Sequence, residues 1–431
     1  MSSEGGGGAD WAGGAIRQQR PSDELRVSQQ DYLSDRGLRY VRPYHFHFVA
    51  NVKKRWAGKT VVGLFTHEFP LRTREYYEGA VRKGNLSLNG RRPGKDETVH
   101  PGNWICHYVH RHEPPVLDLP VELISQTSRF VAVNKPASMP VHPCGQHRKN
   151  TVMGYLKAFH PELGDLFPIH RLDKPVSGVL LFARNSSAAD AFRQELGSGT
   201  VAKVYLARVA GEFPSELRVD AHILYDHRAK RARCAPKKGS SCQGVVEKAA
   251  GVDGARSRTA CTTDAVDPTD TRGEPREAET SFVRRWTNGE HSVVECFPKT
   301  GRTHQIRVHL EFSGFPIVND PVYGPREACA NGLTTGSQIG EGCTAEGSGR
   351  ASKMLKRAVV QATPDVAAGV DVGSDGKRQV DKADIDPDCV HCPFLRPLDY
   401  DLDVRPLWLH AMKYTTSEGV FEAAPPEWAL P

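Results

Sequence analysis

The stretch HRLDKPVSGVLLFA, residues 170–183, joins a charged loop to an apolar strand and is the most informative part of the chain. Residues 176–184 are almost continuously apolar, as in a strand that is covered on both faces. Asp173 lies in the loop just before, between Arg171 and Lys174, whose positive charges favour an ionised carboxylate. Such a carboxylate can serve as a nucleophile or as a general base, although an aspartate beside an arginine is more often a structural ion pair.

Further regular elements are predicted around this stretch. Strands are expected at 130–134, at 204–211, on either side of the Asn288–Gly289 turn within 281–297, and from Leu407 onward. Helices are expected at 188–196 and 303–312, the first of them capped by Asn185 or Ser186. Inside the apolar strand, Gly178 permits a tight backbone.

The composition indicates a folded core that carries long irregular segments. Of 431 residues, 39% are hydrophobic, which is enough for at least one sizeable core, while 40 are Gly and 30 are Pro. Residues 1–38 are predicted to be a disordered tail, and the polar stretches near 233–278 and 326–388 are predicted to be insertions. The net charge of +6 suits a polyanionic partner without requiring one.

The cysteine pattern and the absence of long apolar runs indicate which compartment and which partners to expect. The ten cysteines form no dense framework, which favours free thiols in a reducing compartment. No run of 18 apolar residues is present, so no membrane partner is expected. The N-terminal residues lack the apolar segment of a secretory signal. We expect the cytoplasm or the nucleus, with the mitochondrion left open.

Six segments occur in the order in which RluA-family RNA pseudouridine synthases have them. After HRLD with its SG pair, these are VNKPASMPVHP at 133–143, KVYLARVAG at 203–211, KTGRTHQIRVHL at 299–310, GFPIVNDPVYG at 314–324 and LWLHA at 407–411. The chain therefore resembles that family over about 280 residues. The resemblance implies an α+β pseudouridine synthase fold, with a mixed, mainly antiparallel central sheet and flanking helices. Ser138 and Asn319 stand where the family usually has Gly.

The resemblance also implies roles for site residues. Asp173 matches the family's catalytic aspartate, which acts on the ribose of the target uridine. Tyr205 matches the tyrosine that packs on the flipped base, and Arg307 matches the basic residue that pairs with the aspartate. Arg171 matches the arginine that enters the RNA stack when the uridine flips out.

Other motif positions are assigned to RNA contact or to the pocket. Arg302, His304 and Gln305 match family hallmarks that contact RNA or knit the site together. Leu181 and Ile306 match the apolar walls of the pocket. Isomerisation needs neither redox chemistry nor an added group, so no cofactor is expected.

The front of the chain, residues 39–115, resembles an S4-like RNA-binding module. Its features are a helix at 74–83 that ends at Gly84 and a hairpin turn at Asn89–Gly90. Four basic residues are expected to contact RNA phosphates: Arg82, Lys83, Arg91 and Arg92. A solvated charged surface is the alternative. The catalytic domain is then expected to span 116–431.

The sequence contains two groups of possible metal ligands. His107, His110 and His112 form HYVHRH, and no cysteine or carboxylate at matching spacing completes a site there. Cys389 and Cys392 form an isolated C-x-x-C, for which a structural zinc would need two further ligands. The sequence therefore predicts no metal.

The predicted function is conversion of specific uridines to pseudouridine, in a monomer. YVRPYHFHF through HYVHRHEPPV resembles the eukaryotic branch that contains tRNA anticodon-loop enzymes, so tRNA of the uridine-32 type is the expected substrate. The same chemistry on ribosomal or messenger RNA is an alternative, as is a catalytically silent RNA-binding protein. A metal-dependent hydrolase or deaminase is a third.

Overall fold

The computed structural model describes residues 26–70, 72–226, 229–235, 245–248, 274–325, 385–387, 389–398, 400 and 404–431. The chain divides into two compact units. The smaller contains residues 42–112 together with the described part of 371–398, and the larger contains 27–41, 113–370 and 399–431. No helix among the described residues is long and apolar enough to cross a membrane.

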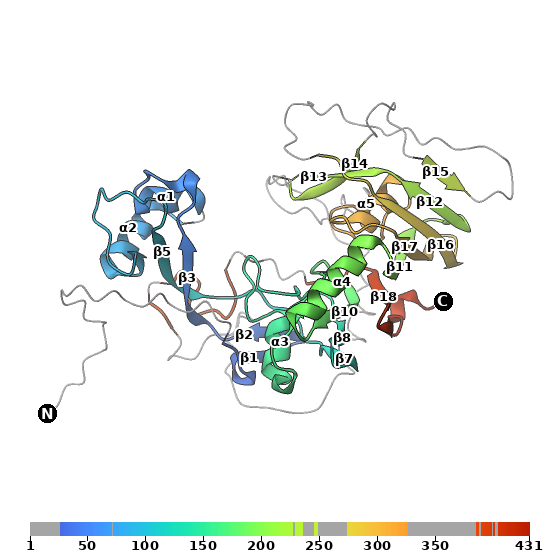
Figure 1. The fold of residues 1–431 in the computed structure, drawn as a ribbon, viewed down its shortest axis with the longest axis horizontal. Helices are drawn as coiled ribbons and strands as arrows, with labels where there is room; N and C mark the ends of the chain where they lie inside the picture. Colours follow the sequence, from blue (N-terminus) through green and yellow to red (C-terminus); the bar gives the residue numbers. More distant parts are fainter. Residues whose placement is uncertain are drawn as a thin grey trace, which may run out of the picture. The chain divides into compact units, whose positions relative to one another are not determined.

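A large mixed sheet forms the larger unit (Figure 1). Across the sheet, the strands are β15 (Val245–Lys248), β12 (Glu216–Asp220), β16 (Glu279–Thr287), β17 (His291–Pro298), β11 (Ala202–Ala210), β18 (Leu409–Thr416), β10 (Ser177–Ala183), β8 (Phe130–Lys135) and β7 (Glu122–Gln126). β19 (Gly419–Glu422) pairs with β18, and β9 (Phe167–Pro168) pairs with β10. All pairings are antiparallel except that of β10 with β18, which is parallel. The predicted mixed, mainly antiparallel sheet is confirmed.

Three helices pack their apolar side chains into the core of this sheet: α3 (Val152–Phe159), α4 (Ser186–Ser198) and α5 (Gln305–Phe312). The Asn185 side chain accepts a hydrogen bond from the Ala188 N–H at 2.8 Å, so the predicted cap of α4 is confirmed. α5 begins two residues later than predicted because His304 has a left-handed backbone with φ 58°. Short 3₁₀ turns complete the elements: η1 (Gln29–Asp31), η2 (Lys54–Trp56), η3 (Pro161–Leu163) and η5 (Glu427–Ala429).

Gly178 is where β10 meets β18 most closely. It pairs with Ala411 and has φ 111°. A Cβ at this position would lie 2.2 Å from the Ala411 carbonyl oxygen, so a larger residue would push the strands apart. The loop just after β8 has its own constraint, since Ser138 adopts φ 70° where the family usually has Gly. Asn319 has no positive φ, and its side chain instead donates to the Pro406 carbonyl and accepts from the Trp408 N–H.

The prediction of a disordered tail over 1–38 was wrong for residues 26–38, which are part of the described structure, whereas residues 1–25 lie outside the described residues. β1 (Tyr32–Asp35) and β2 (Leu38–Val41) form a small sheet with β6 (Val116–Leu117). The Tyr32 hydroxyl donates to the Lys149 carbonyl at 2.7 Å, and the buried Arg39 guanidinium lies over the Tyr155 ring. These partners are more than a hundred residues away, so local composition could not reveal them.

The smaller unit is an α/β module, as its sequence predicted. Its sheet has the order β3 (Tyr44–Asn51), β5 (Trp104–Arg111) and β4 (Leu86–Leu88), with α1 (Val61–Glu68) and α2 (Arg74–Lys83) packed in one core (Figure 1). Gly84 ends α2 in a left-handed conformation, and Asn89–Gly90 form the turn with φ 50° and 79°. Both predictions are confirmed.

The two predicted insertions are described only in part. β14 (Arg231–Ala235) pairs with β13 (His222–Asp226), and β15 pairs with β12, so the stretch 233–278 contributes strands. The rest of it, up to 273, lies outside the described residues, as do 326–384. Residues 385–398 belong to the smaller unit, whereas the sequence assigned everything after 116 to one domain. Their contacts with β5, described below, are the physical reason.

Candidate active site

A cavity of about 320 Å³ opens in the larger unit at the motif residues. The loop before β10 supplies Arg171 and Asp173, β11 supplies Tyr205, and the start of α5 supplies His304 and Arg307. The fold thus brings together residues that are up to 136 positions apart, because β11 and β10 are joined through β18 and α5 follows β17.

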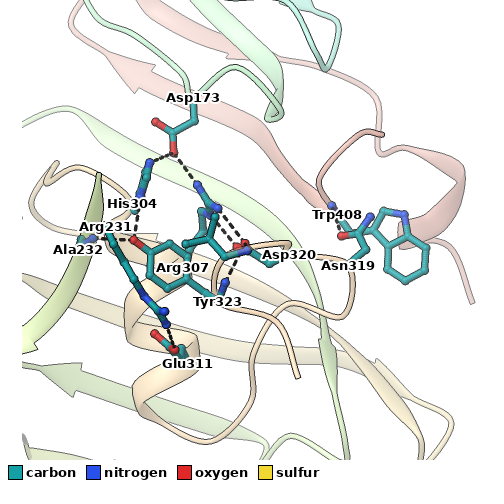
Figure 2. A network of polar contacts seen from close by, with 11 residues as sticks. Asp173, Arg231, Ala232, His304, Arg307, Glu311, Asn319, Asp320, Tyr323 and Trp408 are labelled. Carbon is teal, nitrogen blue, oxygen red and sulfur yellow. Dashed lines mark hydrogen bonds and ion pairs between the residues drawn. The ribbon is translucent and has the colours of Figure 1, made fainter. Parts of the chain in front are cut away.

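Arg307 is fixed by a second carboxylate. Its Nε and Nη2 donate to the two oxygens of Asp320 at 2.6 and 2.8 Å, and both side chains are buried (Figure 2). Asp320 in turn accepts the N–H groups of Val322 and Tyr323. Although burial opposes it, the hydrogen bonds to Asp320 raise the pKa of Arg307. The guanidinium is therefore a permanent, oriented charge.

Asp173 faces the Arg307 guanidinium but forms no tight ion pair with it. Its Oδ2 lies 3.5 Å from Arg307 Nη1 and 3.6 Å from His304 Nε2. Among the described residues no donor contacts the other oxygen, Oδ1. The Asp173 side chain retains 21% of its exposure, against 4% for Arg307. One oxygen is thus oriented while the other is free for a substrate.

A chain of hydrogen bonds orients His304. The Tyr323 hydroxyl accepts the Ala232 N–H at 2.7 Å and lies 2.9 Å from His304 Nδ1 (Figure 2). Because a carboxylate only accepts, the proton of the neutral imidazole is assigned to Nε2, which faces Asp173, and Nδ1 then accepts from the Tyr323 hydroxyl. Burial lowers the pKa of His304, against the opposing charge of Asp173. A neutral ring that donates toward the carboxylate is the result.

Lys135 holds the backbone around Asp173. The side chain is fully buried at the end of β8, and its ammonium donates to the carbonyls of Pro136, Lys174 and Val176 at 2.9, 3.2 and 2.7 Å. Two of these carbonyls lie within three residues after Asp173. The lysine therefore fixes the loop that presents the carboxylate.

Tyr205 forms part of an aromatic wall. Its hydroxyl bonds to that of Tyr414 at 2.7 Å, and the Tyr414 ring stacks on His170 with centroids 4.8 Å apart. The His170 Nε2 accepts the Leu181 N–H at 3.0 Å. Burial raises the pKa of Tyr205 to about 12, so the phenol stays neutral. All three rings line the cavity.

The other predicted site residues divide between the cavity and the framework. Ile306, Arg302 and the exposed Arg171 line the cavity. Leu181 does not, and its side chain is 1% exposed within the core. The prediction placed it on the pocket wall, but only its backbone serves the site, through His170.

Gln305 is held entirely within the protein. Its Oε1 accepts from the Thr300 hydroxyl and the Arg302 N–H, and its Nε2 donates to the Glu279 carbonyl and to Thr280. The amide has no free capacity for RNA, so Gln305 knits the loop before α5 to β16.

In the smaller unit, the four predicted phosphate-binding residues Arg82, Lys83, Arg91 and Arg92 are all exposed. Arg91 is paired with Glu97 through both terminal nitrogens, which offsets its charge. Arg82 and Lys83 form the last turn of α2.

Sequence reasoning missed three supports of the site, Asp320, Tyr323 and Lys135. Asp320 and Tyr323 stand in the GFPIVNDPVYG segment, and Lys135 in VNKPASMPVHP. Their membership in family motifs was a signal that they matter. Their partners are tertiary contacts, which the motifs do not reveal.

Comparison with known proteins shows the family of the chain. The RNA pseudouridylate synthase family model matches residues 129–312. RNA pseudouridine synthase 7 of Oryza sativa is 41% identical over 407 residues, covering 93% of each chain. The mitochondrial tRNA pseudouridine(32) synthase of Saccharomyces cerevisiae is 32% identical over 413 residues, covering 93% of this chain and 79% of its own. The tRNA pseudouridine(31) synthase of the same yeast is 33% identical over 317 residues, covering 68% and 74%.

The fold and cavity define an enzyme that isomerises a residue of RNA. The chain belongs to the RNA pseudouridine synthase family, in its RluA-type branch, as the six motifs predicted. Its substrate is RNA, and its reaction is that of an isomerase.

Proposed function

We propose that the protein converts a uridine of the tRNA anticodon loop, of the uridine-32 type, to pseudouridine, with Asp173 as the catalytic residue. The observation that carries this proposal is the half-open Asp173 carboxylate, whose Oδ2 faces Arg307 and whose Oδ1 has no partner among the described residues. A carboxylate that faces a guanidinium with one oxygen and is open at the other is suited to act on a ribose.

The neighbouring side chains fit the remaining steps. The target uridine must leave the base stack before its glycosidic bond can be reached. Arg171 is exposed at the cavity and is planar and cationic, so it can fill the vacated stack. Tyr205 offers the face of a ring to the detached base while it rotates. Asp173 could attack the sugar carbon or remove a ribose proton. Both routes need a free carboxylate oxygen that faces the ribose.

The choice of tRNA rests on two relatives. The two yeast proteins described above are named for uridines 31 and 32 of tRNA. The exposed basic residues of the smaller unit, which we propose to be S4-like, would contact the phosphates of such a substrate. The same chemistry on ribosomal or messenger RNA is the alternative, since substrate choice depends on RNA shape. The yeast uridine-32 enzyme is named as mitochondrial, so that compartment stays among the candidates.

The test is site mapping of pseudouridine by chemical adduct and primer extension. Unmodified tRNA transcripts are incubated with the wild-type protein and with Asp173→Asn, which keeps the size of the side chain. A stop at position 32 with the wild type alone supports the proposal. A stop at 31 corrects the position, and stops only on ribosomal or messenger RNA correct the substrate. Equal stops with both proteins would show that Asp173 is not catalytic.

A further inference from the structure

Two pairs of metal-binding side chains, far apart in sequence, meet in the smaller unit. His110 lies near the end of β5 and His112 directly follows the strand, and residues two apart in extended chain project to the same side. Cys389 and Cys392 lie in a turn that the Cys392 N–H closes onto the Cys389 carbonyl at 3.2 Å. One ligand atom from each of the four residues lies within 4.8 Å of the other three.

The distances are those of atoms arranged around one ion. Cys392 Sγ lies 3.5 Å from His110 Nδ1 and 3.5 Å from His112 Nε2. In a tetrahedral zinc site with Zn–S near 2.3 Å and Zn–N near 2.0 Å, the sulfur and nitrogen are about 3.5 Å apart. A thiol has a single proton and can donate it to one of these nitrogens only. Hydrogen bonding from the thiol alone therefore does not account for both approaches.

The surroundings of Cys392 supply a backbone donor to its sulfur and limit the ligand set to four. The Asp386 N–H donates to Cys392 Sγ at 3.4 Å, a contact that would orient the sulfur as a metal ligand. His391 lies between the cysteines in sequence but is not a ligand. Its ring packs edge-on against His112, its Nδ1 accepts the Leu398 N–H, and its Nε2 faces Arg72.

We propose that His110, His112, Cys389 and Cys392 bind one Zn²⁺ in a structural site that fastens residues 385–398 to β5. Two sulfur and two nitrogen donors in a tetrahedral arrangement are typical of zinc. Four protein ligands leave no open position for a substrate, so the ion has no part in the isomerisation. Sequence spacing concealed the site because the two pairs are 280 positions apart.

A bound metal ion would stabilise the smaller unit at this position. The module has a small hydrophobic core, and the segment 385–398 follows a long polar stretch with little apolar material of its own. Closing so long a loop with bonds to an ion stabilises the folded state by restricting the unfolded one. The site is independent of the chemistry proposed for Asp173.

The test measures zinc and thiol protection in the full-length protein. We expect about one zinc per chain by elemental mass spectrometry after dialysis. Cys389 and Cys392 should resist alkylation until a strong chelator is added, whereas the exposed Cys144 should react in both conditions. Substitution with Co²⁺ should give the intense visible absorption of a tetrahedral ion with thiolate ligands.

Matched variants complete the test. Cys392→Ser should lose the zinc, and Cys144→Ser should retain it. If Cys392→Ser does not fold, alkylation of the wild-type protein with and without chelator still tests whether the two cysteines bind zinc. Wild-type protein that is free of zinc and has reactive Cys389 and Cys392, or a Cys389–Cys392 disulfide found by mass spectrometry, would overturn the proposal. Zinc retained at full stoichiometry in folded Cys392→Ser would do the same.

Discussion

Arg307 donates two short hydrogen bonds to Asp320 and reaches Asp173 only at 3.5 Å. The residue that orients the site's arginine is therefore not the residue predicted to do the chemistry. Asp320 accepts hydrogen bonds from Nε and Nη2 of the arginine, and Nη1 is directed at Asp173. This division places a positive charge beside Asp173 without burying its carboxylate in a tight ion pair.

Asp320→Asn tests this division. The change leaves a buried guanidinium with a neutral partner, so we expect a loss of about 3 kcal/mol in the free energy of unfolding. We also expect kcat to fall by about 100-fold, since small displacements in a site cost that much. Chemical denaturation and single-turnover kinetics measure the two effects. The control is Asp165→Asn, which changes an exposed carboxylate paired with Lys157. An unchanged kcat in Asp320→Asn would refute the positioning role of Asp320.

Tyr323→Phe should act through His304. Removing the hydroxyl leaves His304 Nδ1 without its donor and the Ala232 N–H without its acceptor. We expect kcat to fall about tenfold with KM unchanged, and stability to fall by about 1 kcal/mol. In a His304→Ala background the kinetic effect should disappear, because the hydroxyl then has no ring to orient. Equal effects in both backgrounds would assign another role to the hydroxyl.

Lys135→Met removes the ammonium that binds three carbonyls near Asp173. The volume is similar, but the carbonyls of Lys174 and Val176 lose their donor in a buried setting. We expect a loss of about 1–3 kcal/mol in stability and a reduced kcat. Lys157→Met, on the half-exposed side of α3, is the comparison and should change neither quantity appreciably.

Two glycine substitutions contrast a constrained site with a free one. Gly178→Ala places a methyl group 2.2 Å from the Ala411 carbonyl oxygen and requires φ 111°. We expect a loss of about 3 kcal/mol and a distorted cavity. Gly197→Ala, in α4 with open space around it, should be neutral or stabilise by up to about 1 kcal/mol. Thermal unfolding measures both, and a stable Gly178→Ala would show that β18 can move away.

His309 should make stability depend on pH. Its Nε2 donates to the Ala221 carbonyl and its Nδ1 accepts from Thr280, and burial lowers its pKa to about 4. As pH falls from 6.5 toward 4, the unfolded chain binds a proton here and the folded chain does not, so stability is lost over that window. The contribution reaches about 3 kcal/mol. Urea unfolding at pH 7 and pH 4.5 should show a smaller difference in His309→Gln than in the wild type.

Local signals predicted local structure well. Gly84 and Asn185 marked helix ends correctly because caps depend on a few neighbouring residues. The start of α5 was misplaced because the left-handed backbone of His304 belongs to a tertiary network. The predicted disordered segment was extended too far for the same reason, since the hydrogen-bond partner of Tyr32 comes from a distant segment.

The family motifs predicted the residues that line the site, but they did not predict the residues that hold these in place. The contact between Arg307 and Asp173 followed from the resemblance, whereas the pairing of Arg307 with Asp320 needed coordinates. Leu181 was assigned to the wall, but the fold turns its side chain into the core. A period-two pattern does not say which face of a strand buried on both sides meets the cavity.

The place of β18 in the sheet has a consequence for the newly made protein. β18 lies between β10, which follows the Asp173 loop, and β11, which holds Tyr205. A ribosome must therefore translate past residue 416 before the two halves of the catalytic cleft can be joined. Shortened products of an interrupted messenger would lack this central strand, so we expect incomplete synthesis to yield inactive chains rather than enzymes of relaxed specificity.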